Sequence, residues 1–234
     1  MILCIETATP VCSVALCNRE GVVSARENTD GKSHASLLTV FISDILREQG
    51  IDASRLEAVA VSRGPGSFTG LRIGVSVAKG IAYRAGIPLI GVDTMTSMYN
   101  GIAGISAQKY GLDKDSLLCP MLDARRMEVF YSLFSTDGSV VKDVSAEVIG
   151  NDSFSGISDD IKVLFFGNGA GKCEGVIARK NSFFEPGFQV SASHMRIPAY
   201  MAADAGKYED VAYFEPFYLK DFIATTPRKS ITGQ

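Results

Sequence analysis

The chain has 234 residues, of which 46% are apolar and 21% charged, and its formal net charge is −3. This length suits one large core or two small ones, and the charge excludes the broad basic surface that independent nucleic-acid binding usually needs. We therefore expect a globular protein that would meet RNA only locally or through a partner.

Five cysteines are scattered along the chain without a CxxC pair, and an odd number cannot all pair within one chain. They are Cys4, Cys12, Cys17, Cys119 and Cys173. They are typical of buried apolar residues in a reducing cytosol, so we expect a cytoplasmic protein.

The opening MILCIE predicts a strand without a charged leader, which argues against a signal peptide. Arg72, Lys79 and Arg84 interrupt the longest apolar stretch, 71–92, and exclude a comfortable membrane span.

The first half of the chain predicts a β-meander followed by alternating helices and strands. The stretch ILCIETATPVCSVALCNREGVVSARE contains two or three short strands with a break at Thr9. From Ser33, a predicted N-cap, apolar residues recur at helical spacing over 33–49. LEAVAVS predicts a buried strand, and the glycine-rich stretch SRGPGSFTGLRIG then leads into a second helix over 68–85 and a strand at IPLIGV.

The second half repeats this plan. SLLCPMLDARRMEVFYSLFSTDGSVV again predicts three strands with a polar turn and a tight turn between them. IKVLFFGNGAGKCEGVIA predicts a strand, a glycine-rich loop and a helix, as LEAVAVSRGPGSFTGLRIG does earlier. Two copies predict a duplicated α/β fold, with the polar segment 106–116 at the boundary. We therefore divide the chain into an N-terminal subdomain, 1–105, and a C-terminal subdomain, 106–234, which ends in a mobile tail without apolar periodicity.

The glycine-rich stretch raises the question of phosphate binding. It lacks the lysine and hydroxyl of a Walker A loop, and its glycines miss the spacing of a dinucleotide fingerprint by one. Two interpretations stay open: the amides of residues 67–69 bind an anion with help from the helix dipole, or the stretch is a turn in which Ser67 caps the helix. The candidate anion-binding residues here are Gly64, Gly66, Ser67 and Thr69.

The helix over 68–85 carries small residues at four-residue steps. Gly70, Gly74, Ala78 and Ala82 form a column with almost no side chain. A helical glycine costs about 1 kcal/mol relative to alanine, so the column indicates close approach by another element. That element is either the protein's own sheet or a second subunit that meets this helix and the helix over 33–49.

Several stretches resemble one known family. The opening ILCIETATPVCSVAL, the HASLL after Ser33, the run AVSRGPGSFTGLRIGVSVAKGIAYRAGIPLIGVDT and the later DARRMEVFY are similar to the TsaB family, also called YeaZ. The resemblance covers residues 1 to about 135 and is diffuse afterwards, and RGPGSFTGLRIG is highly specific to this group. It implies an actin-like ATPase (ASKHA, ribonuclease H-like) α/β fold of two duplicated subdomains, in agreement with the repeat.

The resemblance also implies a function in tRNA modification. Members of the family belong to a complex that places a threonylcarbamoyl group on N6 of the adenosine at position 37 of tRNAs reading ANN codons. In that complex the paralogue TsaD transfers the group, TsaE is an ATPase, and TsaB is a required partner without catalysis of its own. We expect this chain to be such a scaffold, which binds and activates TsaD, forms a homodimer when TsaD is absent, meets tRNA only through the complex and uses no cofactor.

We expect the helices over 33–49 and 68–85 to dock the TsaD paralogue. This interpretation joins the small-residue column with the family motif. His34 begins the first helix, where a capping or partner-facing role suits it better than catalysis. The predicted interface residues are His34, Leu37, Leu38, Phe41, Gly70, Leu71, Gly74, Val75 and Ala78.

The catalytic paralogue carries an HxxxH metal motif that this chain lacks. Thr94 and Met98 stand where the histidines would be, and His34 and His194 are the only histidines in the sequence. We therefore expect no metal site and no catalytic residues. A metallopeptidase-like hydrolase is one alternative function, although the sequence has no GxSxG elbow.

A second alternative is an actin-like ATPase or phosphotransferase that binds nucleotide at its glycine loops. Active members of that fold have an aspartate and a glycine turn in the first hairpin, whereas this chain has ETAT from Glu6, and Ala8 adopts that turn less freely. In the second half DARR from Asp123 supplies an acid and two cations or forms ion pairs at a subdomain edge. GNGAGK at 167–172 binds phosphate or serves as a turn. The further candidate nucleotide-binding residues are Glu6, Thr7, Asp123 and Arg125.

Overall fold

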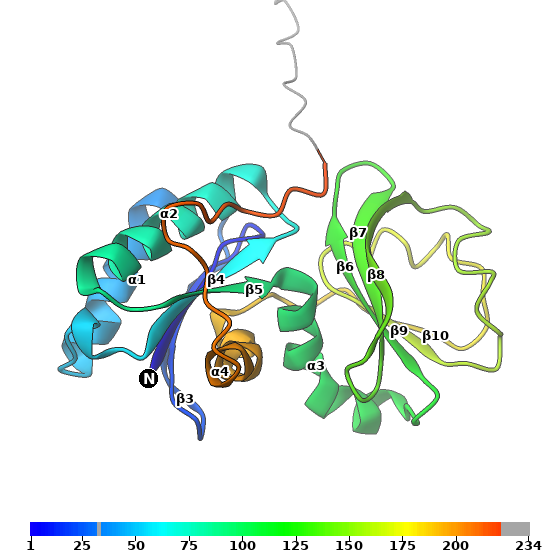
Figure 1. Ribbon diagram of the computed structural model, residues 1–234. Helices are drawn as coiled ribbons and strands as arrows, with labels where there is room; N and C mark the ends of the chain where they lie inside the picture. Colours follow the sequence, from blue (N-terminus) through cyan, green and yellow to red (C-terminus); the bar gives the residue numbers. More distant parts are fainter. Residues whose placement is uncertain (32–33, 221–234) are drawn as a thin grey trace, which may run out of the picture.

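The protein, seen in a computed structural model, has two lobes, each built on a five-stranded mixed sheet (Figure 1). The structure describes residues 1–31 and 34–220, without the side chains of residues 34 and 105–107. The predicted N-cap at Ser33 and the predicted mobile tail lie outside these residues.

The first lobe confirms the predicted meander and the two predicted strands that follow it. Its sheet has the order β3-β2-β1-β4-β5, in which the first three strands are antiparallel and β4 and β5 run parallel to β1. β1 and β2 are buried along their whole length because both faces of the sheet are covered. The strands are β1 (Ile2–Glu6), β2 (Cys12–Cys17), β3 (Val22–Asn28), β4 (Ala58–Gly64) and β5 (Leu89–Asp93).

The second lobe confirms the predicted duplication. Its sheet has the order β10-β9-β6-β7-β8, so β6 to β10 repeat the positions and directions of β1 to β5. The strands are β6 (Leu117–Asp123), β7 (Glu128–Ser135), β8 (Val140–Val148), β9 (Val163–Phe166) and β10 (Ser182–Glu185).

Helices cover both faces of the first sheet. The two predicted helices, α1 (His34–Glu48) and α2 (Phe68–Ala85), pack on one face, and the 3-10 turn η1 (Ala53–Arg55) links α1 to β4. The turn η2 (Ala192–Met195) and α4 (Arg196–Asp204) cover the other face. The second sheet receives α3 (Thr94–Tyr110) on one face and turn-rich segments on the other.

The predicted helix after GNGAGK is wrong. Residues 168–177 form successive turns that cover the second sheet, where Cys173 and Ile177 are buried. Three glycines within this stretch, Gly169, Gly171 and Gly175, weaken a helix by about 1 kcal/mol each, and the short loop reaches the sheet without one.

The division predicted at residues 105 and 106 falls inside α3 rather than in a linker. α3 follows β5 of the first sheet but packs on the second, and α4 follows β10 of the second sheet but packs on the first. The chain therefore passes between the lobes twice, and α3 and α4 lie next to each other in the centre of Figure 1. The sequence pattern predicts where elements begin and end, but it does not indicate which sheet each helix covers. The packing of α3 and α4 on the opposite lobes therefore could not be predicted.

Three glycines of the glycine-rich stretch lie directly against the turn between β1 and β2. A Cβ atom at Gly66 would collide with the carbonyl oxygen of Ala8, one at Gly70 with the carbonyl oxygen of Thr7, and one at Gly74 with the Thr7 hydroxyl. We call this contact the glycine seam. The close neighbour of the small-residue column is thus the same chain, so the interpretation as packing on its own sheet holds, and the column does not admit a second subunit.

The seam predicts opposite effects for two glycines of one helix. Gly70→Ala places a Cβ on backbone that cannot move cheaply, and we expect it to lower the free energy of unfolding by about 1–3 kcal/mol. Gly80, exposed on α2 with open space around it, is the control, because Gly80→Ala should raise the free energy of unfolding by about 0.5–1 kcal/mol. Urea unfolding of both variants measures the difference, and equal effects would contradict the seam.

Candidate functional site

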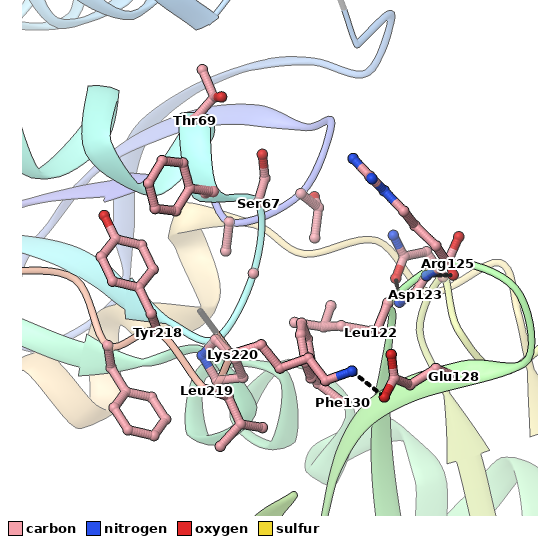
Figure 2. Close-up of a pocket in the computed structure, with 18 of the residues that line it drawn as sticks. Ser67, Thr69, Leu122, Asp123, Arg125, Glu128, Phe130, Tyr218, Leu219 and Lys220 are labelled. Carbon is pink, nitrogen blue, oxygen red and sulfur yellow. Dashed lines mark hydrogen bonds and ion pairs between the residues drawn. The ribbon is translucent and has the colours of Figure 1, made fainter. Parts of the chain in front are cut away.

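A cleft of about 480 Å³ lies between the two lobes (Figure 2). The first lobe contributes the β1–β2 turn and the start of α2 to its walls, and the second lobe contributes the β6–β7 turn. The last described segment, 217–220, forms a further wall. Asn168 of the GNGAGK stretch also lines the cleft, which therefore joins five stretches that are far apart in the sequence.

The structure brings together most of the predicted anion-binding residues. Gly66, Ser67 and Thr69 line the cleft from the first lobe, and Asp123 and Arg125 line it from the second. The other three, Glu6, Thr7 and Gly64, are buried behind the wall.

Local structure uses part of the predicted anion-binding capacity at the start of α2. The Ser67 hydroxyl caps the helix by accepting a hydrogen bond from the Gly70 amide at 3.2 Å. The Ser67 amide donates to the carbonyl oxygen of Ala8 at 2.7 Å and is not free for a ligand. The turn-and-cap interpretation therefore accounts for Ser67.

The β6–β7 turn contains the predicted acid and cation. Asp123 pairs with Lys172 and accepts a hydrogen bond from the Arg125 amide at 2.8 Å. Burial raises the pKa of Asp123, but the contacts with Lys172 and Arg125 outweigh it, so the pKa lies below its ordinary value. The ion-pair interpretation holds for Asp123. Arg125 has a left-handed backbone with φ 75°, and its side chain extends toward the side of the cleft that carries Ser67 (Figure 2).

The GNGAGK stretch forms a turn that packs on β6, and its cation is already paired. Gly167 has φ 101°, and a Cβ there would meet the Met121 carbonyl oxygen of β6 at 2.5 Å. Lys172, the one cation of the stretch, is held by Asp123 and by the carbonyl oxygen of Glu128. Its charge is thus satisfied within the lobe.

Glu6 is fully buried at the end of β1. Its Oε1 accepts a hydrogen bond from the Ala8 amide at 2.7 Å. Burial raises the pKa of Glu6 to about 7, and the Ala8 amide and the Ser62 hydroxyl offset only part of this rise. The carboxyl group does not line the cleft, so it is not placed to position a metal-bound water there.

The positions of the paralogue's metal ligands lie inside the fold. Thr94 begins α3 and is buried, as is Met98, which packs near Gly167. His194 stacks on Phe188 with ring centroids 5.3 Å apart, and burial lowers its pKa. The side chain of His34 lies outside the described residues. Within the described ranges, no group of three His, Cys, Asp or Glu side chains is arranged to hold a metal ion.

All five cysteines are buried and unpaired, which confirms their predicted role as small apolar residues. In the portion of the chain that the structure describes, no helix is long and apolar enough to cross a bilayer.

Sequence analysis missed the cleft wall made by residues 217–220. Tyr218 and Lys220 of this segment reach α2 and β7, respectively. The sequence feature that could have indicated this wall is the aromatic run FEPFYLK at 214–220. Nothing in that run indicates which other part of the fold it contacts.

Comparison with known sequences relates the chain to proteins of tRNA modification. A family model described as "TsaD: tRNA N6-adenosine threonylcarbamoyltransferase" matches residues 23–160. The Escherichia coli K12 "tRNA threonylcarbamoyladenosine biosynthesis protein TsaB" is 32% identical over 95% of this chain and 96% of its own length. A Haemophilus influenzae protein of the same name is 32% identical over 56% of this chain and 52% of its own length.

Comparison with solved structures supports the fold. "YeaZ from Pseudomonas aeruginosa" superposes with a TM-score of 0.79 at 23% identity, over 93% of this chain and 99% of that chain. This likeness agrees with the predicted actin-like, duplicated α/β fold.

The buried carboxyl group of Glu6 predicts a pH-dependent stability. Between its ordinary pKa of 4.5 and its folded pKa of about 7, the unfolded chain loses the proton that the folded chain keeps. The free energy of unfolding therefore falls as pH rises through this window, by about 3 kcal/mol in full. Glu6→Gln has no proton to lose, so its stability relative to wild type should grow from pH 4.5 to pH 8. Thermal unfolding across this range provides the measurement, and parallel curves for the two proteins would contradict the assignment.

Proposed function

The chain belongs to the TsaB (YeaZ) family, and from that premise we propose that it acts in forming threonylcarbamoyladenosine in tRNA, as a non-catalytic partner that binds and activates a TsaD-type subunit. Full-length similarity to a protein named for this pathway supports the process. The proposal that this chain is the non-catalytic subunit rests on the contacts of its glycine-rich motif.

One observation carries the non-catalytic role: internal contacts occupy the glycines and the Ser67 amide of the glycine-rich motif. Gly66 and Gly70 accommodate the β1–β2 turn, and the amide of Ser67 is bonded to Ala8. A loop that grips phosphate instead needs its amides free and its glycines facing the ligand. The motif is therefore explained by folding, and a structural partner needs nothing further from it.

The structure changes which residues can dock a partner. Most of the predicted interface is buried within the chain, and among the residues whose side chains are described only Leu37 and Phe41 are partly exposed. A substitution at Gly74 would disturb Thr7 and would test folding rather than docking. The buried residues are Leu38, Gly70, Leu71, Gly74, Val75 and Ala78.

We place the docking face on the outward residues of α1 and α2. The two helices contact each other on the same face of the first sheet, and each presents apolar side chains that the core covers only in part. Such a surface is typical of a helix pair that meets another chain. We call it the apolar stripe; its residues are Leu37, Val40, Phe41, Ile73 and Val77.

The remaining partners follow from the same role. A second copy of this chain would pair through the apolar stripe when the TsaD-type subunit is absent, since one surface serves both. A TsaE-type ATPase and the tRNA would join through the assembled complex, which fits a chain whose net charge is −3.

The apolar stripe predicts a charge-sensitive interface. Val40, 48% exposed, should tolerate Val40→Glu in the isolated chain but weaken binding to a TsaD-type subunit by about tenfold or more, because the carboxylate would be buried on docking. Val141, 56% exposed on β8, provides the control Val141→Glu, which should leave binding unchanged. Calorimetry of each variant with the purified subunit measures the affinity.

Reconstituted tRNA modification tests the same two variants, Val40→Glu and Val141→Glu, for function. Product should be lost when this chain is omitted and reduced with Val40→Glu at limiting concentration, whereas Val141→Glu should behave as wild type. Full product without the chain would contradict the required-partner role, and equal binding of the two variants would contradict the stripe.

A second candidate function is nucleotide or phosphate binding in the cleft. The observation that favours it is the convergence of Gly66, Ser67, Thr69, Asp123 and Arg125 on one cavity. Among the described side chains, no carboxylate forms an ion pair with the Arg125 guanidinium, so it is available to an anion.

Calorimetry with magnesium-ATP separates the two candidates. The scaffold role predicts no saturable heat for the isolated chain. Saturable binding that Arg125→Asn weakens about tenfold would favour the second candidate. Arg126, exposed in the same turn with a similar left-handed backbone and outside the cleft wall, supplies the control Arg126→Asn, which should have no effect.

A further inference from the structure

The last described residues cross from one lobe to the other. Residues 214–220 run along α2 and end beside the second lobe (Figure 1), and residues 217–220 line the cleft. We call this segment the strap. The Phe214 side chain is buried in the core under α2, and Lys79 of α2 donates to the Phe214 carbonyl oxygen at 3.0 Å. The strap is therefore anchored firmly at its first residue.

The middle of the strap is seated on the glycine-rich motif. The Phe217 amide donates to the carbonyl oxygen of Arg63 at 2.6 Å. A Cβ at Gly64 would collide with the Phe217 carbonyl oxygen, so this glycine, with φ 118°, leaves the space in which the strap lies. One motif thus shapes both the first-lobe wall of the cleft and the seat of the strap.

Tyr218 fastens the strap to the start of α2. Its ring packs on Phe68 with centroids 4.8 Å apart, and its hydroxyl accepts a hydrogen bond from Arg72 Nε at 3.0 Å. The Arg72 guanidinium lies 4.1 Å from the centre of the Phe68 ring, so the three side chains form one stack. All of these contacts stay within the first lobe.

Lys220 makes the contact that reaches the second lobe. Its Nζ pairs with the carboxylate of Glu128 at the start of β7, as the dashed line in Figure 2 shows. Glu128 is 19% exposed and Lys220 50% exposed, so the pair is partly solvated and easily broken. A firmly anchored segment that ends in a partly solvated ion pair on the opposite lobe has the form of a latch.

We propose that residues 214–220 latch the two lobes together across the mouth of the cleft, and that breaking the Lys220–Glu128 contact lets the cleft widen. The lobes are joined elsewhere by α3 and by the chain leading to α4, which cross in the lower centre of Figure 1. The latch lies at the top of Figure 1, whereas these crossings lie below it between the lobes. A contact far from a hinge resists opening best, so a weak ion pair suffices there.

Charge reversal with a matched rescue tests the latch in the full chain. Lys220→Glu should speed amide hydrogen exchange at Phe217 by about fivefold, because the strap then loses its ion pair with the second lobe and is held by the first lobe alone. The swapped pair Lys220→Glu with Glu128→Lys should restore the wild-type rate. Lys162 pairs with Asp113 inside the second lobe, so Lys162→Glu is the control and should leave the rate unchanged.

A distance between the lobes tests whether release of the strap opens the cleft. Spin labels on Thr69→Cys and Val148→Cys, both exposed and on opposite lobes, report the separation, and the five native cysteines are buried. Lys220→Glu should shift the distance distribution to longer values, and the swapped pair should reverse the shift. Unchanged distances, a strap that exchanges faster without any shift, or a swapped pair that fails to restore both readouts would overturn the proposal. Both measurements use the isolated chain, so they do not depend on the proposed function.

Discussion

The backbone of the β1–β2 turn lies on α2 at positions where no side chain fits, and the arrangement of the first lobe depends on this contact. Carbonyl oxygens of Thr7 and Ala8 occupy the space that Cβ atoms at Gly70 and Gly66 would take. The hydrogen bond from Ser67 to Ala8 then fixes the start of the helix against the turn. Since both stretches line the cleft or lie directly behind it, the seam sets the shape of one cleft wall.

The same constraint gives the whole motif a structural meaning. Gly64 leaves room for Phe217, and the residues that follow hold the β1–β2 turn. Glycine is required at each of these contacts for steric reasons that apply without any ligand. A sequence signature that looks like a phosphate grip can therefore persist in a chain that binds no phosphate. This agrees with the proposed role as a partner subunit, in which Thr94 and Met98 stand where the family resemblance puts a catalytic paralogue's metal ligands.

Local patterns predicted most of the elements, and the duplicated sheet followed from their repetition. α1, α2 and the strands of both sheets occupy the predicted ranges because their apolar periodicity is clear. α3 was not predicted because small and polar residues dilute its apolar period, and α4 was not predicted because it is a short helix of nine residues that contains Pro198. Residues 168–177 form turns because their glycines oppose a helix. Of the predicted site, Ser67 and Asp123 reach the cleft, and the local Ser67 cap could be predicted from spacing. The hydrogen bond from the Ser67 amide to Ala8 and the ion pair of Asp123 with Lys172 could not, because Ala8 and Lys172 come from distant turns.

The small-residue column shows why an interface could not be assigned from sequence. A helix that packs closely on its own backbone and one that packs on another chain both require small side chains, so the pattern is the same in the two cases. Burial separates them: Gly70 and Gly74 face Thr7, while Ile73 and Val77 of the same helix are only half-buried. α2 therefore has an inner column committed to the β1–β2 turn and an outer stripe open to a partner. One helix of 18 residues carries both the inner column and part of the apolar stripe. A chain docked on the stripe would therefore contact the same helix whose start forms the cleft wall.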